Sequence, residues 1–198
     1  MALHAPAPVA ALTRRLVAFF LDGFILIPVY AIYAFVLDSV FGALVEPDPN
    51  GAGVVVVAVD PVRMALELTL TLVTDAAYFA GCWARWGMTP GQRICGVAVR
   101  AVGPGSPPAP GQPRGLPPDP ERVPLPVASV RWAVLQVLPL CCSTLGAAGA
   151  LPIGIVAGIN TGWYALLFLT AVVDPLRRGV HDRIAGTAVV RAPARRRR

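Results

Sequence analysis

Lysine is absent from this 198-residue chain, and all 17 of its basic residues are arginine. Charge of either sign is scarce, because only 14% of the residues are charged while 56% are hydrophobic. A soluble domain usually carries about a quarter charged residues, so the composition argues against one and predicts an integral membrane protein. An arginine-only basic set beside abundant alanine, proline, glycine and valine is typical of a GC-rich, bacterial genome.

Cysteine is also sparse, with four residues at Cys82, Cys95, Cys141 and Cys142. None forms a C-x-x-C pair or stands at metal-ligand spacing from a histidine, so the pattern predicts no disulfide, no metal and no cofactor. The chain lacks H-E-x-x-H, a phosphate loop and any Ser-His pair within its apolar runs. An intramembrane aspartyl protease, the enzyme class weighed most closely, would need a G-x-G-D element that is missing. We therefore expect no enzyme.

Long apolar runs dominate what is present. A membrane-crossing helix needs roughly 20 apolar residues, and four segments reach that length, at about 16–37, 62–83, 132–150 and 153–173. Asp22 interrupts the first run and no small-x-small site follows it, so we interpret this run as a retained helix instead of a cleaved signal. The sequence GAAGALPIG between the last two predicts a tight turn. The expected fold is an all-α membrane protein, a four-transmembrane-helix bundle made of two hairpins.

The placement of the arginines predicts the orientation of these helices. Arginines precede the first span, fill the segment between the second and third, and follow the fourth, whereas Arg63 alone falls on the other side. The segment between spans one and two instead carries Glu46, Asp48 and Asp60. The positive-inside rule then places both termini in the cytoplasm of a bacterial plasma membrane. Anionic lipid headgroups account for the basic charge better than nucleic acid does.

Composition also divides the chain into five parts. A short cytoplasmic tail, 1–13, precedes a first half, 14–102, and a second half, 127–191, ends before a basic tail, 192–198. Between the halves, residues 103–126 are dense in proline and glycine. Such a segment cannot bury a core, so we expect it to be disordered or extended. A plain linker is the favoured interpretation, with a docking motif as the alternative.

A short motif occurs after the second span and again after the fourth. The two copies share R-I-x-G-x-A-V at 93–99 and 183–189. Each is preceded by a helix-start signal, Thr89-Pro90 in one and Asp174-Pro175 in the other, with proline favoured at the first helical position. The glycine at the same place in each copy would let the chain turn from a helix into a Val-rich strand. We expect residues 97–100 and 187–190 to pair as a two-stranded cytoplasmic sheet. The motif residues are Thr89, Pro90, Gly91, Arg93, Gly96, Asp174, His181 and Gly186.

Ionisable residues inside the apolar runs are the main functional candidates. Arg15 and Asp22 are two helical turns apart and share a helix face. A charged group at the centre of a membrane helix costs about 2.5 to 3.5 kcal/mol, so an aspartate there should face the bundle interior or find a partner. The second span adds Glu67 and Asp75. One interpretation is an ion or proton path through Asp22, Glu67 and Asp75. The other is that these groups only hydrogen-bond helices together.

Three stretches carry a family resemblance: R-R-L-V-A-F-F-L-D at 14–22, G-M-T-P-G-Q-R-I-C-G-V-A-V at 87–99, and R-R-G-V-H-D-R-I-A-G-T-A-V-V at 177–190. They resemble the RDD family of integral membrane proteins. The resemblance implies that the family's arginine is Arg15, its first aspartate Asp22 and its second Asp182. It covers nearly the whole chain apart from the Pro-rich segment and the tails. One departure is Met88, where a second glycine is more usual.

Two hypotheses about function remain, one implied by the resemblance and one suggested by the thinness of a four-helix bundle. The first is transport of an ion or small ligand coupled to protons, and the second is a non-enzymatic accessory or scaffold subunit of a larger membrane complex, with a homo-oligomer also compatible. The resemblance also implies partners for Asp22. If the segment that carries Asp182 folds back under the bundle, Arg15 could bridge the carboxylates of Asp22 and Asp182. That set would be either a structural clasp or a proton- or cation-responsive gate.

Overall fold

The computed structural model describes residues 9–43, 45–47, 54–56, 60–102, 123–147, 149 and 151–192. Within these residues the chain forms four long helical segments. Two of them are regular helices, and two contain a π-helical turn in the middle. The segments are α1 (Leu12–Phe41); α2 (Pro61–Asp75) continued by η1 (Ala76–Ala80) and α3 (Gly81–Trp86); α5 (Leu125–Trp132) continued by η2 (Ala133–Val137) and α6 (Leu138–Ala147); and α7 (Ile153–Val173).

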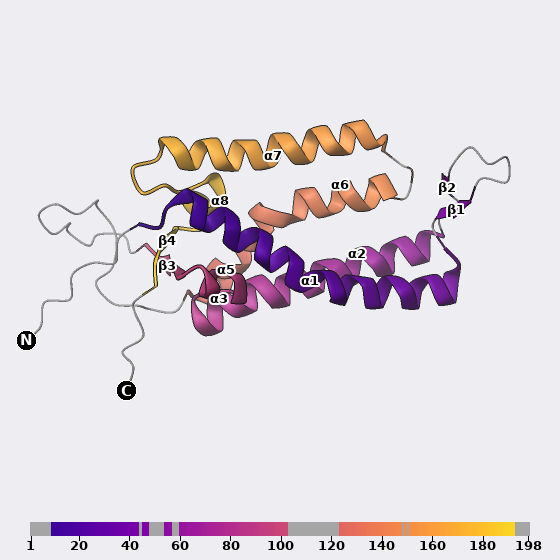
Figure 1. Cartoon of the computed structure of the whole chain (residues 1–198), viewed down its shortest axis with the longest axis horizontal. Helices are drawn as coiled ribbons and strands as arrows, with labels where there is room; N and C mark the ends of the chain where they lie inside the picture. The colour runs from indigo at the N-terminus through magenta and orange to yellow at the C-terminus, as the bar shows by residue number, and fades with distance from the viewer. Residues whose placement is uncertain are drawn as a thin grey trace, which may run out of the picture.

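The long segments run roughly along one axis, with small elements gathered at both ends (Figure 1). One end, called here the sheet end, holds α4 (Pro90–Ile94), β3 (Val97–Ala101), α8 (Val180–Ile184) and β4 (Thr187–Arg191). The opposite, far end holds β1 (Val45–Pro47) and β2 (Val54–Val56), which pair with each other. The chain therefore makes two helical hairpins whose open ends meet at the sheet end.

Three of the long segments are apolar and long enough to cross a membrane: Leu12–Phe41, Leu125–Ala147 and Ile153–Val173. Their most apolar windows have mean hydropathies of 2.1, 1.5 and 1.6, and few residues within those windows are buried by protein. The segment at 61–86 is not among them, because Arg63, Glu67, Asp75 and Arg85 lower its hydropathy. The described chain is thus a helical protein with multiple membrane-spanning candidates.

The predicted helix bounds are close for some segments and short for others. The fourth predicted span coincides with α7, whereas the first and third helices begin earlier than the apolar runs, at Leu12 and Leu125. In the third, Pro126 occupies the first turn, where a missing N–H costs nothing. The helix therefore starts inside the segment assigned to the linker. Apolar periodicity marks only the part of a helix that meets lipid, so it misses these extensions. Residues 103–122 lie outside the described part of the chain.

The repeated motif folds as the sequence predicts. Residues of β3 and β4 pair antiparallel, with Val99 opposite Val189, and the predicted two-stranded sheet is confirmed. In both copies the glycine between helix and strand has a positive φ, 64° at Gly96 and 63° at Gly186. A left-handed backbone is accessible to glycine without steric cost, so these residues end each short helix and turn it into its strand.

The two copies begin differently. Thr89 caps α4 through a capping box with Gln92, as the Thr-Pro signal predicts. Asp174, by contrast, lies at the C-terminal boundary of α7, and α8 begins six residues later at Val180. The Asp174 carboxylate accepts hydrogen bonds from the backbone N–H groups of Leu176 and Arg178, at 3.0 Å each. The prediction that Asp174-Pro175 starts a helix is wrong, because the carboxylate stabilises a turn instead.

The tightest packing lies at the sheet end. Ala10, Ala18, Trp83, Val97 and Val99 are almost inaccessible to solvent and belong to one hydrophobic cluster. Farther along the bundle, α1 and α7 expose large apolar side chains such as Phe24, Phe35 and Ile155. Such continuous exposed apolar surface is unusual on soluble proteins and is what lipid-facing helices require. The sheet end is therefore where protein packing buries the most side chains completely.

Candidate functional site

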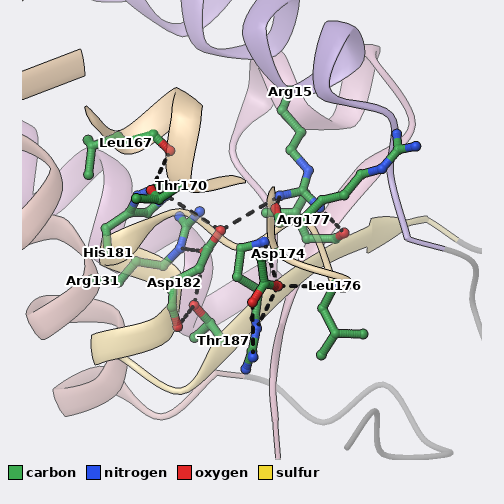
Figure 2. Close-up of polar contacts among 12 residues, drawn as sticks. Arg15, Arg131, Leu167, Thr170, Asp174, Leu176, Arg177, His181, Asp182 and Thr187 are labelled. Carbon is green, nitrogen blue, oxygen red and sulfur yellow. Dashed lines mark hydrogen bonds and ion pairs between the residues drawn. The ribbon is translucent and has the colours of Figure 1, made fainter. Parts of the chain in front are cut away.

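Asp182 of α8 lies at the centre of a buried charge cluster with a side chain 1% exposed (Figure 2). Arg131 Nε donates a hydrogen bond to its Oδ1 at 2.9 Å, and Thr187 Oγ1 donates to the same oxygen at 3.1 Å. Arg15 Nη1 lies 3.7 Å and His181 Nε2 3.6 Å from Oδ2. We call Arg15, Arg131, His181 and Asp182 the charge cluster. It joins α1, α5 and α8 at the sheet end.

Both arginines of the charge cluster are held by further contacts. The Arg131 guanidinium carbon lies 4.1 Å from the centroid of the Trp83 ring, a cation–π arrangement. Arg15 donates to the backbone carbonyl oxygens of Val189, at 2.9 Å, and of Arg177. Arg15 thus ties the start of α1 to strand β4 and to the turn after α7. These contacts fix the positions of the two positive charges around Asp182.

Burial and neighbouring charge act in opposite directions on the pKa of Asp182. Burial alone would raise the pKa of this carboxyl group, but His181, Arg131 and Arg15 surround it and lower its pKa to about 2. For His181, burial is the largest effect and lowers the pKa to about 4, with Arg131 and Arg15 also lowering it and Asp182 opposing them. At neutral pH the cluster therefore contains two cations, one carboxylate and a neutral imidazole.

His181 is expected to make the folded protein acid-sensitive. Its pKa is about 4 in the fold and 6.5 when unperturbed, so between these values the unfolded chain binds a proton that the folded chain does not. Stability must then fall as pH drops from about 6.5 to 4. The loss is on the order of 3 kcal/mol, because a difference of one between the two pKa values corresponds to ~1.4 kcal/mol. Thermal unfolding of the detergent-solubilised chain across pH 4–7.5 measures this effect.

The His181→Gln variant should flatten that acid limb. A separate loss of stability below pH 3.8, where the depressed pKa of Asp182 becomes important, should remain in the variant. His4 is present in both proteins, so the difference between their curves reports His181. An acid limb of equal steepness in both would show that His181 does not cause it.

Asp22 occupies a different environment from the one predicted. Its Oδ1 accepts hydrogen bonds from Tyr78 Oη at 2.7 Å and from the Gly91 N–H at 2.8 Å, and its Oδ2 accepts from Thr89 Oγ1 at 2.6 Å. Among the described residues, no ion pair joins Asp22 to Arg15. The idea that Arg15 bridges both carboxylates is wrong, because neutral donors from Tyr78, Thr89 and Gly91 occupy both carboxyl oxygens of Asp22. Asp22 fastens α1 to α4.

Asp75, in the middle of the second helical segment, is a third buried carboxyl group, 2% exposed. Tyr30 Oη donates a hydrogen bond to its Oδ1. Asp75 lines a cavity of about 360 Å³ between α1, η1, η2 and α6, whose wall also includes Tyr30 and Gln136. One helical turn from Asp75 toward the far end, the hydroxyl groups of Thr71 and Tyr33 form a hydrogen bond of 2.6 Å. One turn farther on, Glu67 is half-buried. Polar groups therefore follow the α1–α2 interface as far as this cavity.

A second cavity, also of about 360 Å³, lies nearer the sheet end between α1 and α7. We call it the α1–α7 cavity and the first one the Asp75 cavity. The charge cluster lies in the wall of the α1–α7 cavity, and Asp22 contributes to the same wall. The two cavities share Phe19, Phe20 and Phe79 as wall residues. They are therefore neighbours, separated by aromatic side chains.

The predicted motif residues divide by their role in the fold. Thr89 and Gly91 bind Asp22, Gly96 and Gly186 make turns, and Arg93 is exposed. Pro90 starts α4. The partner that sequence reasoning missed is Arg131, which makes the shortest contact with Asp182. The sequence contained a signal for this partner, because Arg15 and Arg131 lie near the start of the first long helix in each half.

Together, the apolar helices, the buried charge cluster and the paired motifs define a multi-pass helical membrane protein with polar groups inside its bundle. The chain belongs to the RDD family, whose model matches residues 9–112, more than half of its length. The match includes Arg15, Asp22 and the first motif copy, while Asp182 lies beyond it. No curated protein and no solved structure matches the chain.

Proposed function

We propose that this RDD-family protein crosses a bacterial plasma membrane four times and transports an ion or small ligand in exchange for protons. Asp75 is the proton- or cation-carrying group. The observation that carries the proposal is that Asp75 is buried at mid-helix yet faces the Asp75 cavity. Ionisable residues inside membrane bundles that face a cavity are typical of ion and proton pathways.

The orientation that transport requires follows from where the arginines lie. In the described residues, the sheet end and the elements attached to it carry all the arginines except Arg63, which lies at the far end. Arg63 is neutralised locally by Asp38 and donates to the carbonyl oxygen of Gly42. Under the positive-inside rule the sheet end faces the cytoplasm, and the start of α1 and the end of β4 lie there with it.

The fourth crossing is made by the polar segment at 61–86. It packs against α1 and α6 in the bundle, and its exposed Arg85 lies in α3 near the sheet end. Arg63 and Asp75 are both buried within the protein. A helix that turns its charged residues toward its neighbours can cross a bilayer even when its mean hydropathy is low.

Two interruptions of regular helix occur beside the Asp75 cavity. The π-helical turn η1 begins directly after Asp75, and η2 contains Gln136 in the cavity wall. Single π-turns inside α-helices are frequently found at functional sites. Their position supports a binding role for this cavity over a purely structural bundle interior.

The test is cation-dependent proton flux in proteoliposomes containing the full chain. Asp75→Asn keeps the side-chain shape and removes the titratable group, and we expect it to reduce flux at least tenfold. Asp60→Asn is the matched control, because it removes an exposed carboxylate at the start of the same helical segment, outside both cavities, where asparagine can still cap the helix. Equal flux in wild type and Asp75→Asn would refute the role of Asp75.

The accessory-subunit hypothesis is distinguished by the same preparation. Two results together would favour it. The wild-type protein would show no proton flux above empty vesicles with Na⁺, K⁺ or Li⁺, and it would elute from mild detergent with a stoichiometric foreign protein. A thin four-helix bundle leaves little room for a pathway in one copy, so the oligomeric state should be measured alongside. Flux that scales with the fraction of dimers would place the pathway at a contact between copies.

A further inference from the structure

The α1–α7 cavity combines an apolar wall with an incompletely satisfied cationic floor. Most of its lining is apolar, with leucine and phenylalanine side chains such as Leu12, Leu16, Phe19, Phe20 and Phe168 as the largest group. The charge cluster contributes the charged part of the same lining together with Asp22. Such a division between an apolar body and a few polar groups is typical of sites that bind amphiphilic molecules.

Hydrogen-bond donors at the floor lack partners. Arg131 is 3% exposed, and its Nη1 has no hydrogen-bond partner among the described residues; the same holds for Arg15 Nε. The Trp83 ring covers the flat face of the Arg131 guanidinium. The N–H groups of Arg131 lie in the guanidinium plane, so the ring does not accept a hydrogen bond from Nη1. A buried donor without an acceptor is costly, so these groups fit an acceptor that enters the cavity.

The charges around this floor determine whether an anionic, cationic or neutral ligand is favoured there. Arg15 and Arg131 face one carboxylate, Asp182, and the imidazole beside them is neutral at pH 7 because burial lowers the pKa of His181 to about 4. Asp22 also borders the cavity, but it forms no ion pair with either arginine among the described residues, and its carboxyl oxygens accept hydrogen bonds from Tyr78, Thr89 and Gly91. Directly beside the two arginines, an anion is therefore favoured over a cation or a neutral group.

The mouth of the cavity is bordered by exposed apolar side chains of α1 and α7. Phe20 is 58% exposed and Leu16 and Phe168 are each 46% exposed, on two helices that are apolar enough to span the bilayer. Phe19 and Tyr164 meet at 5.7 Å between their ring centroids and close the inner side. A small hydrated anion would leave these apolar walls uncovered, whereas an acyl chain would cover them.

We propose that the α1–α7 cavity binds one anionic phospholipid from the leaflet at the sheet end. The phosphate group accepts hydrogen bonds from Arg131 Nη1 and Arg15 Nε, and an acyl chain lies between Phe20 and Phe168. Arginine suits this role because its planar group presents several donors to phosphate oxygens. The site is independent of proton exchange at Asp75, and either proposal can fail alone.

The test uses the purified full chain in mild detergent. Native mass spectrometry and thermal unfolding are measured with added phosphatidylglycerol, with zwitterionic phosphatidylcholine of the same acyl chains, and with inorganic phosphate alone. We expect one retained phosphatidylglycerol per chain and a higher unfolding temperature with that lipid only. Equal stabilisation by phosphatidylcholine, or by inorganic phosphate, would overturn the proposal, the latter by indicating a site for free anions.

Two variants probe the two ends of the site. Arg15→Gln removes one cationic partner and should weaken phosphatidylglycerol binding about tenfold, the equivalent of one charge-assisted hydrogen bond. Leu16→Trp fills the exposed mouth without touching the charge cluster and should weaken binding similarly. Val36→Trp is the matched control, since Val36 is an exposed position of the same helix outside both cavities. Unaltered lipid binding in Leu16→Trp, whether or not Arg15→Gln folds, would contradict binding in this cavity.

Discussion

Replacing Asp182 by alanine is expected to destabilise the folded chain by about 3–5 kcal/mol, as is typical when one member of a buried ion pair is removed. Asp182 is the only carboxylate within ion-pair distance of either Arg15 or Arg131 in the described structure. Without it two buried guanidinium groups repel each other. For a chain of this length the thermal midpoint should fall by roughly 10 °C or more, measured in detergent by tryptophan fluorescence.

Arg183→Ala is the matched control for this prediction. Arg183 is the next residue of α8, carries a full charge and is exposed, so its loss should change stability by less than about 0.5 kcal/mol. A double-mutant cycle with Arg131→Gln and Asp182→Asn measures the coupling directly. A coupling energy near zero, or equal midpoints for Asp182→Ala and Arg183→Ala, would show that the charge cluster does not hold α8 in place.

The clasp and gate hypotheses for Asp182 require different pKa values of its carboxyl group. A clasp should resist protonation in the working pH range, and the low pKa of Asp182, about 2, satisfies that requirement. A gate operated by Asp182 would need its pKa to lie near neutrality. The low pKa and the contacts with Arg15 and Arg131 therefore favour a clasp over a gate operated by protons at Asp182, with Arg131 in place of Asp22 as the additional partner of the set.

Sequence reasoning performs best where a local rule decides the structure. Apolar length locates the long helices, because a lipid-facing helix must be apolar over its whole span. The repeated R-I-x-G-x-A-V predicts the β3–β4 pair, because glycine permits the turn and valine favours an extended strand. Each of these inferences needs only residues that are adjacent in the chain.

Contacts between distant segments are harder to predict. Helical periodicity alone pairs Asp22 with Arg15, yet the partners of Asp22 lie 56 to 69 residues away at Tyr78, Thr89 and Gly91. Nothing local in the sequence states that α4 folds back against α1. The π-helical turns η1 and η2 escape prediction for a related reason, since they depend on packing between helices and have no residue signature of their own.

Asp22→Ala is expected to have an effect comparable to that of Asp182→Ala, but for a different physical reason. Three donors from two elements converge on Asp22, and all would lose their acceptor in a buried site. At about 1–3 kcal/mol for each unsatisfied buried group, with some relief from rearrangement, the loss should be roughly 3–5 kcal/mol. Detergent-phase thermal unfolding and protease sensitivity near α4 would both report it.

Asp22→Asn separates hydrogen bonding from charge at this position. Its amide oxygen can still accept from Tyr78 and Gly91, while its NH₂ group must face the Thr89 hydroxyl, so an intermediate loss is expected. Gly91→Ala tests the same contact from the opposite side, because a Cβ at Gly91 would lie 2.5 Å from the Ala18 carbonyl oxygen and 2.7 Å from Asp22 Oδ1. Gly162→Ala, which meets nothing within 4 Å, is its control. If Gly91→Ala and Gly162→Ala unfold at the same temperature, α4 does not pack against α1 as described, and Asp22 cannot be its anchor.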